Sequence, residues 1–161
     1  MSTFHAYSAA AALTRMLDAV GINPLFASAM HLVMAQRLVR RLDDKTKQAY
    51  QPDESLKKQL QPIIDSLPKA VTKPDLNKVT FYRSGSSAEN PFGYSGQVSL
   101  REQLQMTPGV QQILRLPPNE VTTEMIQKRA VEDGMLTMLQ DGLLKAIEGI
   151  TSLEEVYRVV G

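Results

Sequence analysis

The sequence predicts a mainly α-helical fold, built from helical subdomains with one small antiparallel β-hairpin. Apolar residues recur at spacings of three and four in most segments, and capping residues precede them. Two short stretches of β type, "KVTFYR" and "YSGQVSL", flank the glycine- and serine-rich loop "SGSSAENPFG". The 161 residues are 43% hydrophobic and 22% charged, which is typical of a soluble globular protein.

The first helix follows a short β-like run that ends at His5. Ser8 can accept from the free amides of the first turn, and Gly21 supplies a left-handed stop. The apolar residues of this helix are Leu13, Met16, Leu17 and Val20.

A second helix is predicted from a cap at Asn23, with Pro24 in its first position, to about Leu42. A third, more polar helix begins near Asp53, and Pro62 is expected to kink or end it because proline has no amide hydrogen. The expected buried stripe of the second helix consists of Leu25, Ala29, Leu32, Ala35, Leu38 and Leu42.

Further helices close the chain after the hairpin. Thr107 opens one of them, and Thr122 or Thr123 can cap the next. Ser152 and Glu155 have the spacing of a capping box, in which each side chain binds the free amide of the other residue. The apolar face that precedes this box consists of Leu136, Leu139, Leu143, Leu144 and Ile147.

Composition narrows the possible functions. The formal net charge of +1 gives no overall field that favours nucleic acid or an acidic membrane, and the longest apolar stretch is too short to span a bilayer. The sequence has no cysteine, no G-x-x-x-x-G-K-[ST] loop for phosphates and only two histidines, His5 and His31. We expect a cytoplasmic protein without a dedicated metal site.

Three collinear segments resemble the secretion ATPases of type II secretion and type IV pilus assembly. "STFHAYSAAAALTRMLDAVG" and the following "AQRLVRRL" are similar to that family's T-L-H-T-N-D-A box and its A-Q-R-L-V-R-R-L-C segment. "YRSGSSAENPFGYSGQVSL" is similar to the family's Y-R-x-x-G-C-x-x-C-x-x-x-G-Y-x-G-R-x-G-I. "DGMLTMLQDGLLKAIEGITSLEEVYRVV" resembles its closing segment.

The resemblance implies the C-terminal part of a RecA-like, hexameric motor that uses ATP and magnesium. Residues 1–45 would end the RecA-like core with the His-box strand and two helices. Residues 46–105 would form a connector and hairpin subdomain, and residues 106–161 a C-terminal helical subdomain. The Walker A and Walker B regions would lie upstream, so this chain alone should not hydrolyse ATP. Its partners would be other ATPase subunits and an inner-membrane platform protein, at the cytoplasmic face of that membrane, with no membrane insertion.

The same resemblance suggests candidate site residues, and none of them is catalytic. His5 aligns with a histidine that senses the γ-phosphate, although the residues around it differ from the family's box. Arg37, Arg40 and Arg41, expected on the second helix, match a basic segment that borders the nucleotide or the neighbouring subunit. The alternative is a solvated face on which these arginines pair with nearby acids such as Asp43 and Asp44.

The family's four zinc-binding cysteines correspond here to Asp43, Thr46, Ser86 and Glu89. These residues offer only oxygen atoms and lack the arrangement of a calcium loop, so we expect no metal.

Two other functions stay open. The chain could be a free-standing helical module for protein–protein interaction with no ATPase cycle. Nucleic-acid binding by a basic helix is the weaker alternative, because the charge is balanced and no aromatic residues are interleaved with the basic ones.

Overall fold

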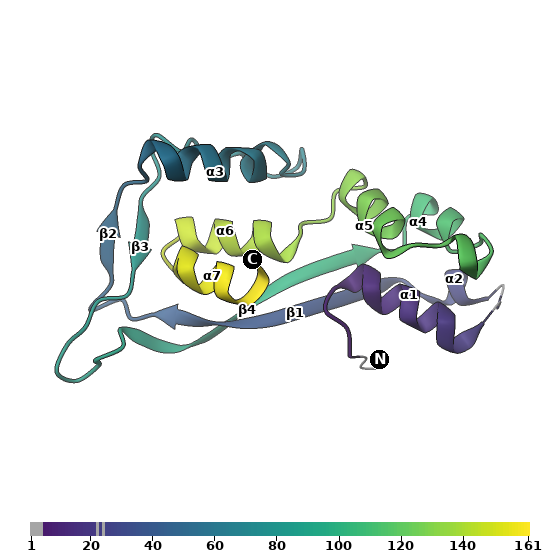
Figure 1. The fold of residues 1–161 in the computed structure, drawn as a ribbon, viewed down its shortest axis with the longest axis horizontal. Coiled ribbons are helices and arrows are strands. Elements are labelled where there is room, and N and C mark those ends of the chain that lie inside the picture. Colours follow the sequence, from purple (N-terminus) through teal and green to yellow (C-terminus); the bar gives the residue numbers. More distant parts are fainter. Residues whose placement is uncertain (1–4, 22, 24) are drawn as a thin grey trace. The chain divides into compact units, whose positions relative to one another are not determined.

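The computed structural model describes residues 5–161, except residues 22 and 24. The chain forms two compact units: unit 1 comprises residues 1–36 and 101–137, and unit 2 comprises residues 37–100 and 138–161. Figure 1 labels their helices and strands. Each unit joins two stretches that are distant in sequence.

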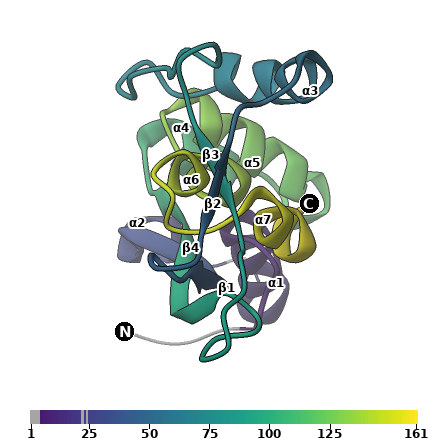
Figure 2. The ribbon, with the colours of Figure 1, turned by 90° about the vertical axis from the view of Figure 1, so that its left-hand side faces the viewer.

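The fold is mixed, with 42% of the described residues in helices and 19% in strands. Strand β1 (Leu32–Leu42) pairs with β4 (Tyr94–Gln105), and β2 (Gln48–Tyr50) pairs with β3 (Phe81–Arg83). The β2–β3 pair is antiparallel, with Ala49 opposite Tyr82, and Figure 2 shows these two strands side by side.

Unit 1 contains α1 (Ala9–Val20), α2 (Phe26–Ala29), α4 (Pro108–Ile113), the short 3-10 helix η1 (Pro118–Glu120) and α5 (Thr123–Glu132). Three expected caps are confirmed, because the hydroxyls of Ser8, Thr107 and Thr122 each accept an amide hydrogen bond in the first turn of their helix. The buried core of unit 1 consists of Ala9, Ala10, Leu13, Leu17, Phe26, Ala27, Leu104, Val110, Leu114, Val121, Ile126, Ala130 and Met135.

Unit 2 contains α3 (Glu54–Asp65), α6 (Met138–Ile147) and α7 (Leu153–Val160). Helices α6 and α7 pack on each other, and both contact β3 (Figure 1). A Cβ atom on Gly142 would lie 2.6 Å from Val156 Cγ1, so the absence of a side chain there permits the close approach of α6 and α7. The side-chain nitrogen Nε2 of Gln140 donates to the carbonyl and hydroxyl oxygens of Ser66, both at 3.0 Å, and so links α6 to the end of α3.

The prediction of a long second helix is wrong. Among the described residues of this stretch only α2 is helical, and residues 32–42 form β1. The expected buried stripe fails at most of its positions, because Leu25, Leu32 and Leu38 are exposed. Leu42 is buried as expected, and Val39, which was not part of the stripe, is buried too. Pairing with β4 overrides the helix propensity of this segment. The expected role of Pro24, and most of the strand expected before His5, lie outside the described residues.

Two further expectations need correction. The stretches expected to form a hairpin do become β3 and β4, but β3 pairs with β2 and β4 pairs with β1. Helix α3 begins after Asp53 as predicted, yet it runs through Pro62 to Asp65. Since Pro62 lies in the last turn, the helix loses one amide hydrogen bond there and still completes that turn.

No helix among the described residues combines the length and the apolar composition needed to cross a membrane.

Candidate functional site

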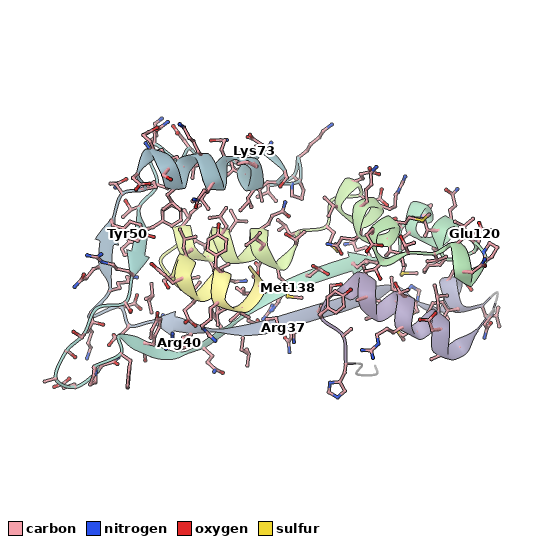
Figure 3. The ribbon with its side chains drawn as sticks, viewed as in Figure 1. Arg37, Arg40, Tyr50, Lys73, Glu120 and Met138 are labelled. Carbon is pink, nitrogen blue, oxygen red and sulfur yellow. The ribbon has the colours of Figure 1, made fainter. Side chains whose placement is uncertain are left out.

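The three candidate arginines lie on strand β1 rather than on a helix. Figure 3 labels two of them, Arg37 and Arg40. Because side chains alternate between the two faces of a strand, Arg37 and Arg41 share one face and Arg40 belongs to the other. The three arginines therefore do not act as one patch, and each has its own surroundings.

Arg40 is held by its side chain and by its backbone. Its guanidinium forms an ion pair with Glu155, and its amide donates to the other carboxylate oxygen of Glu155 at 3.1 Å. The guanidinium carbon lies 4.0 Å from the centre of the Tyr94 ring, in a cation–π contact. The Thr151 hydroxyl donates to the Arg40 carbonyl at 2.8 Å. These contacts fasten β1 to the start of α7.

Glu155 is the centre of this arrangement, and its side chain is only 2% exposed. Arg158 adds two hydrogen bonds to the carboxylate, from Nε at 2.9 Å and from Nη2 at 2.7 Å. Burial alone would raise the pKa of Glu155, but the hydrogen bonds from Arg158 and Arg40 outweigh it and bring the pKa to about 2. We call Arg40, Tyr94, Glu155 and Arg158 the arginine–glutamate cluster.

The predicted capping box is confirmed in one of its two halves. The Ser152 hydroxyl accepts from the Glu155 amide at 3.3 Å, as a cap should. The Glu155 carboxylate binds Arg40 and Arg158, so a residue expected to cap the start of its own helix instead makes a long-range contact.

Arg41 fits the solvated-face alternative. It pairs with Asp44 at 3.1 Å, and both side chains are more than half exposed, so the pair contributes little to stability. Lys47 also binds Asp44, at 2.6 Å, and donates to the Gly149 carbonyl at 3.1 Å beyond the end of α6. The hydrogen bond from Lys47 is the main reason that the pKa of Asp44 is lowered.

Arg37 differs from both Arg40 and Arg41 in its surroundings. It is exposed, and it makes no ion pair with any other residue that the structure describes. Its guanidinium is therefore available, within the described part of the chain, for a phosphate or a carboxylate from outside.

The four positions of the expected degenerate zinc region fall on a turn and a loop that contact each other. Asp43 and Thr46 belong to the turn at residues 43–47, and Ser86 and Glu89 to the loop at residues 84–93. The Asp43 amide donates to the Gly93 carbonyl at 3.0 Å and so joins the two segments.

The residues at these positions do not fit zinc. Both carboxylate oxygens of Asp43 already accept hydrogen bonds, one from the Lys45 amide at 3.0 Å and one from Asn90 at 2.8 Å. Ser86 and Glu89 are exposed, and the described residues contain no group of three or more potential metal ligands. Zinc sites of this kind are built from thiolates or imidazoles, which this turn and loop lack.

His5 belongs to unit 1, whereas the three arginines belong to unit 2. It is exposed, and its carbonyl accepts from the Arg15 guanidinium at 2.7 Å. The helix that follows is fixed by Ser8 and by the buried Glu102, whose carboxylate accepts from the Ala9 amide at 2.8 Å. Glu102 thus ties β4 to the start of α1.

Several of these residues could not be found from the sequence alone. Glu155 was expected only as part of a helix cap, Asn90 only as a member of a loop, and Lys47 not at all. Their partners are distant in sequence, and no local pattern marks such contacts. Tyr94 was expected only as the first residue of a β-type stretch.

Comparison with known proteins identifies the family. The model of the family described as "Type II/IV secretion system protein" matches residues 1–158. The chain belongs to the type II/IV secretion system protein family. This agrees with the resemblance carried by the three sequence segments.

Individual members of the type II/IV secretion system family show the same relationship. The type II secretion system protein E of Xanthomonas campestris pv. campestris is 34% identical over 161 residues, which cover 99% of this chain and 26% of that protein. The type IV pilus assembly ATPase PilB of Pseudomonas aeruginosa is 35% identical over 162 residues, with the same coverage. The type II secretion system ATPase E of Vibrio cholerae is 34% identical over 161 residues and is covered to 29%. The chain thus spans about a quarter of the length of these relatives.

Proposed function

We propose that this chain is the C-terminal portion of a hexameric motor ATPase that powers type IV pilus assembly or type II secretion. The observation that carries the proposal is the family match over residues 1–158, together with relatives that are named as ATPases of these two systems. ATP and magnesium would bind in the complete motor, and this portion alone would not hydrolyse ATP. The motor would work at the cytoplasmic face of the inner membrane, beside a platform protein.

The contribution of this portion would be subunit contact and coupling to the nucleotide state. Arg37 is the best candidate for contact with a neighbouring subunit or a phosphate, since the described residues leave its charge unpaired. Arg40 would act indirectly, because Glu155 and Tyr94 already hold its guanidinium. His5 would have its sensing role only where the rest of the nucleotide site is present.

The test is a chimera in which this chain replaces the matching quarter of the Vibrio cholerae relative. We expect the chimera to hydrolyse ATP in a magnesium-dependent manner and the 161-residue chain alone to show no hydrolysis. A chimera that folds and assembles but does not hydrolyse ATP would favour a free-standing interaction module. Tight binding of magnesium-ATP by the chain alone would contradict both functions.

In the same chimera, Arg37→Ala is expected to lower kcat about tenfold, which corresponds to about 1.4 kcal/mol of lost transition-state or interface stabilisation. The matched control is Arg41→Ala, which removes an exposed pair with Asp44 and should change kcat less than twofold. Steady-state ATPase assays and sedimentation measure the two effects. Equal losses in both variants would show that Arg37 has no special role.

A further inference from the structure

The Asn90 side chain lies between the turn at residues 43–47 and the loop at residues 84–93. Its amide nitrogen donates to Asp43 Oδ2 at 2.8 Å and to the Tyr94 carbonyl at 3.0 Å. Its amide oxygen accepts from the Gly93 amide at 3.1 Å. A primary amide has two donor hydrogens and one acceptor oxygen, so both kinds of group are in use. One side chain thus binds the turn, the end of its own loop and the first residue of β4.

Around Asn90 the two backbones are in direct contact. A Cβ atom on Gly85 would lie 1.9 Å from the Thr46 carbonyl oxygen, and one on Gly93 would lie 1.9 Å from the Gly85 carbonyl oxygen. Gly93 also has a φ of +67°, which side chains rarely adopt. Two glycines therefore permit this approach.

We propose that Asn90 holds this turn and loop together in the place where the family's four-cysteine pattern would hold them with zinc. The proposal rests on geometry and stands apart from the proposed function. Asp43 carries one of the two carboxylates among the four positions, and both of its oxygens are committed, one to Asn90 and one to the Lys45 amide. Hydrogen bonds thus do the cross-linking that a metal ion would otherwise provide.

The same side chain also positions the arginine–glutamate cluster. Asn90 binds the Tyr94 carbonyl, and the Tyr94 ring lies 4.0 Å from the Arg40 guanidinium. Arg40 in turn binds Glu155 of α7. The contacts therefore run from the loop through Tyr94 to the last helix, all within unit 2. Asn90 is a positioning residue in this series, since its side chain binds Asp43, Tyr94 and Gly93 and forms no hydrogen bond with Arg40 or Glu155.

The first test compares Asn90→Ala with Asn119→Ala, an exposed asparagine of unit 1, in the full chain. We expect the melting temperature of Asn90→Ala to fall by about 5 °C, because a partly buried set of hydrogen bonds is lost, and that of Asn119→Ala to change by about 1 °C or less. The melting temperature of Asn90→Asp should fall at least as far at pH 7, because this substitution places a second carboxylate against that of Asp43. Equal melting temperatures for Asn90→Ala and Asn119→Ala would overturn the proposal.

The second test concerns the metal itself. We expect the purified chain to contain far less than one zinc per chain by mass spectrometry, and its melting temperature to be the same with a chelator or with added zinc. Thr46→Val should leave the melting temperature unchanged or raise it, because the buried Thr46 hydroxyl has no hydrogen-bond partner among the described residues. A stoichiometric zinc ion, or a clear loss of stability with chelator, would overturn the proposal.

The third test measures coupling to the cluster. In a double-mutant cycle, Asn90→Ala and Tyr94→Leu should lower the melting temperature by less together than the sum of their separate effects. Hydrogen exchange should also increase at α7 in Asn90→Ala and stay unchanged in Asn119→Ala. Additive effects with unchanged exchange at α7 would refute the link between Asn90 and the last helix.

Discussion

Replacing Glu155 with alanine is expected to lower the free energy of unfolding by about 2–3 kcal/mol, because a buried carboxylate that accepts charged hydrogen bonds is lost while its two arginine partners stay about half exposed. The variant would leave the Arg40 amide and two guanidinium groups without their shared acceptor. Urea denaturation followed by circular dichroism measures the loss. The matched control is Glu154→Ala, which removes an exposed neighbour on the same helix and should cost less than about 0.5 kcal/mol. Similar losses in the two variants would show that the cluster does not stabilise the fold.

The same carboxylate should make stability depend on pH in a defined direction. The pKa of Glu155 falls from 4.5 to about 2 in the folded protein, so the folded state favours the charged form. Its contribution is therefore fully present above about pH 4.5 and is lost as the pH falls toward 2. Glu155→Gln removes this titration, and the stability gap between the wild type and this variant should narrow from pH 6 to pH 3. A gap that stays constant over this range would contradict the assignment.

Replacing Gly93 with alanine is expected to lower the free energy of unfolding by about 3 kcal/mol or more. Two separate causes contribute: a positive φ of 67°, and a Cβ atom that would lie 1.9 Å from the backbone oxygen of Gly85. The first cause alone costs about 1–2 kcal/mol, and the second requires the backbone to move because no flexible side chain can give way.

Gly96 separates these two causes. Its φ is +79°, but a Cβ atom there would meet nothing within 4 Å. Gly96→Ala should therefore lower the free energy of unfolding only by the cost of placing alanine at a positive φ, about 1–2 kcal/mol. Thermal and urea unfolding of both variants give the comparison. If the two variants were equally destabilised, the close contact between Gly93 and Gly85 would not exist in solution.

Most helix beginnings were predictable because their chemistry is local. The cap expected at Asn23 is wrong, because α2 begins at Phe26 with Leu25 before it. Five helices that the sequence predicts are capped at their first turn by a side-chain oxygen, from Ser8, Asp53, Thr107, Thr122 and Ser152. A cap needs only a side-chain oxygen and an amide two or three residues further on, so a single sequence contains the whole signal. The stop at Gly21, with its φ of +69°, was predictable for the same reason.

Strand β1 was not predictable because its sequence suits two structures. Leu32, Ala35 and Leu38 have helical spacing, and most residues of "LVMAQRLVRRL" are good helix formers. The pairing with β4 decides in favour of a strand, and β4 begins more than fifty residues later. The false hairpin has the same origin, since the true partner of β3 is β2, a strand of three residues with too short a pattern to recognise.

The sequence indicated some residues of the candidate site, but it did not indicate what each residue contacts. The resemblance drew attention to Arg40, but 115 residues separate it from Glu155, which determines what Arg40 does. Asp43 was singled out as a former metal position, while its actual partner Asn90 has no sequence signature. Contacts of this kind depend on the folded arrangement of the backbone, which a motif does not specify.

The division of both units into two stretches has a consequence for synthesis on the ribosome. The last stretch of unit 1 ends at residue 137, and that of unit 2 ends at residue 161. During translation unit 1 therefore has its complete sequence first, while β3 must wait for α6 and α7, which pack against it. A nascent chain that stalls before α6 and α7 are made would expose the core of unit 2 to chaperones and proteases, and such distant contacts also favour slow folding.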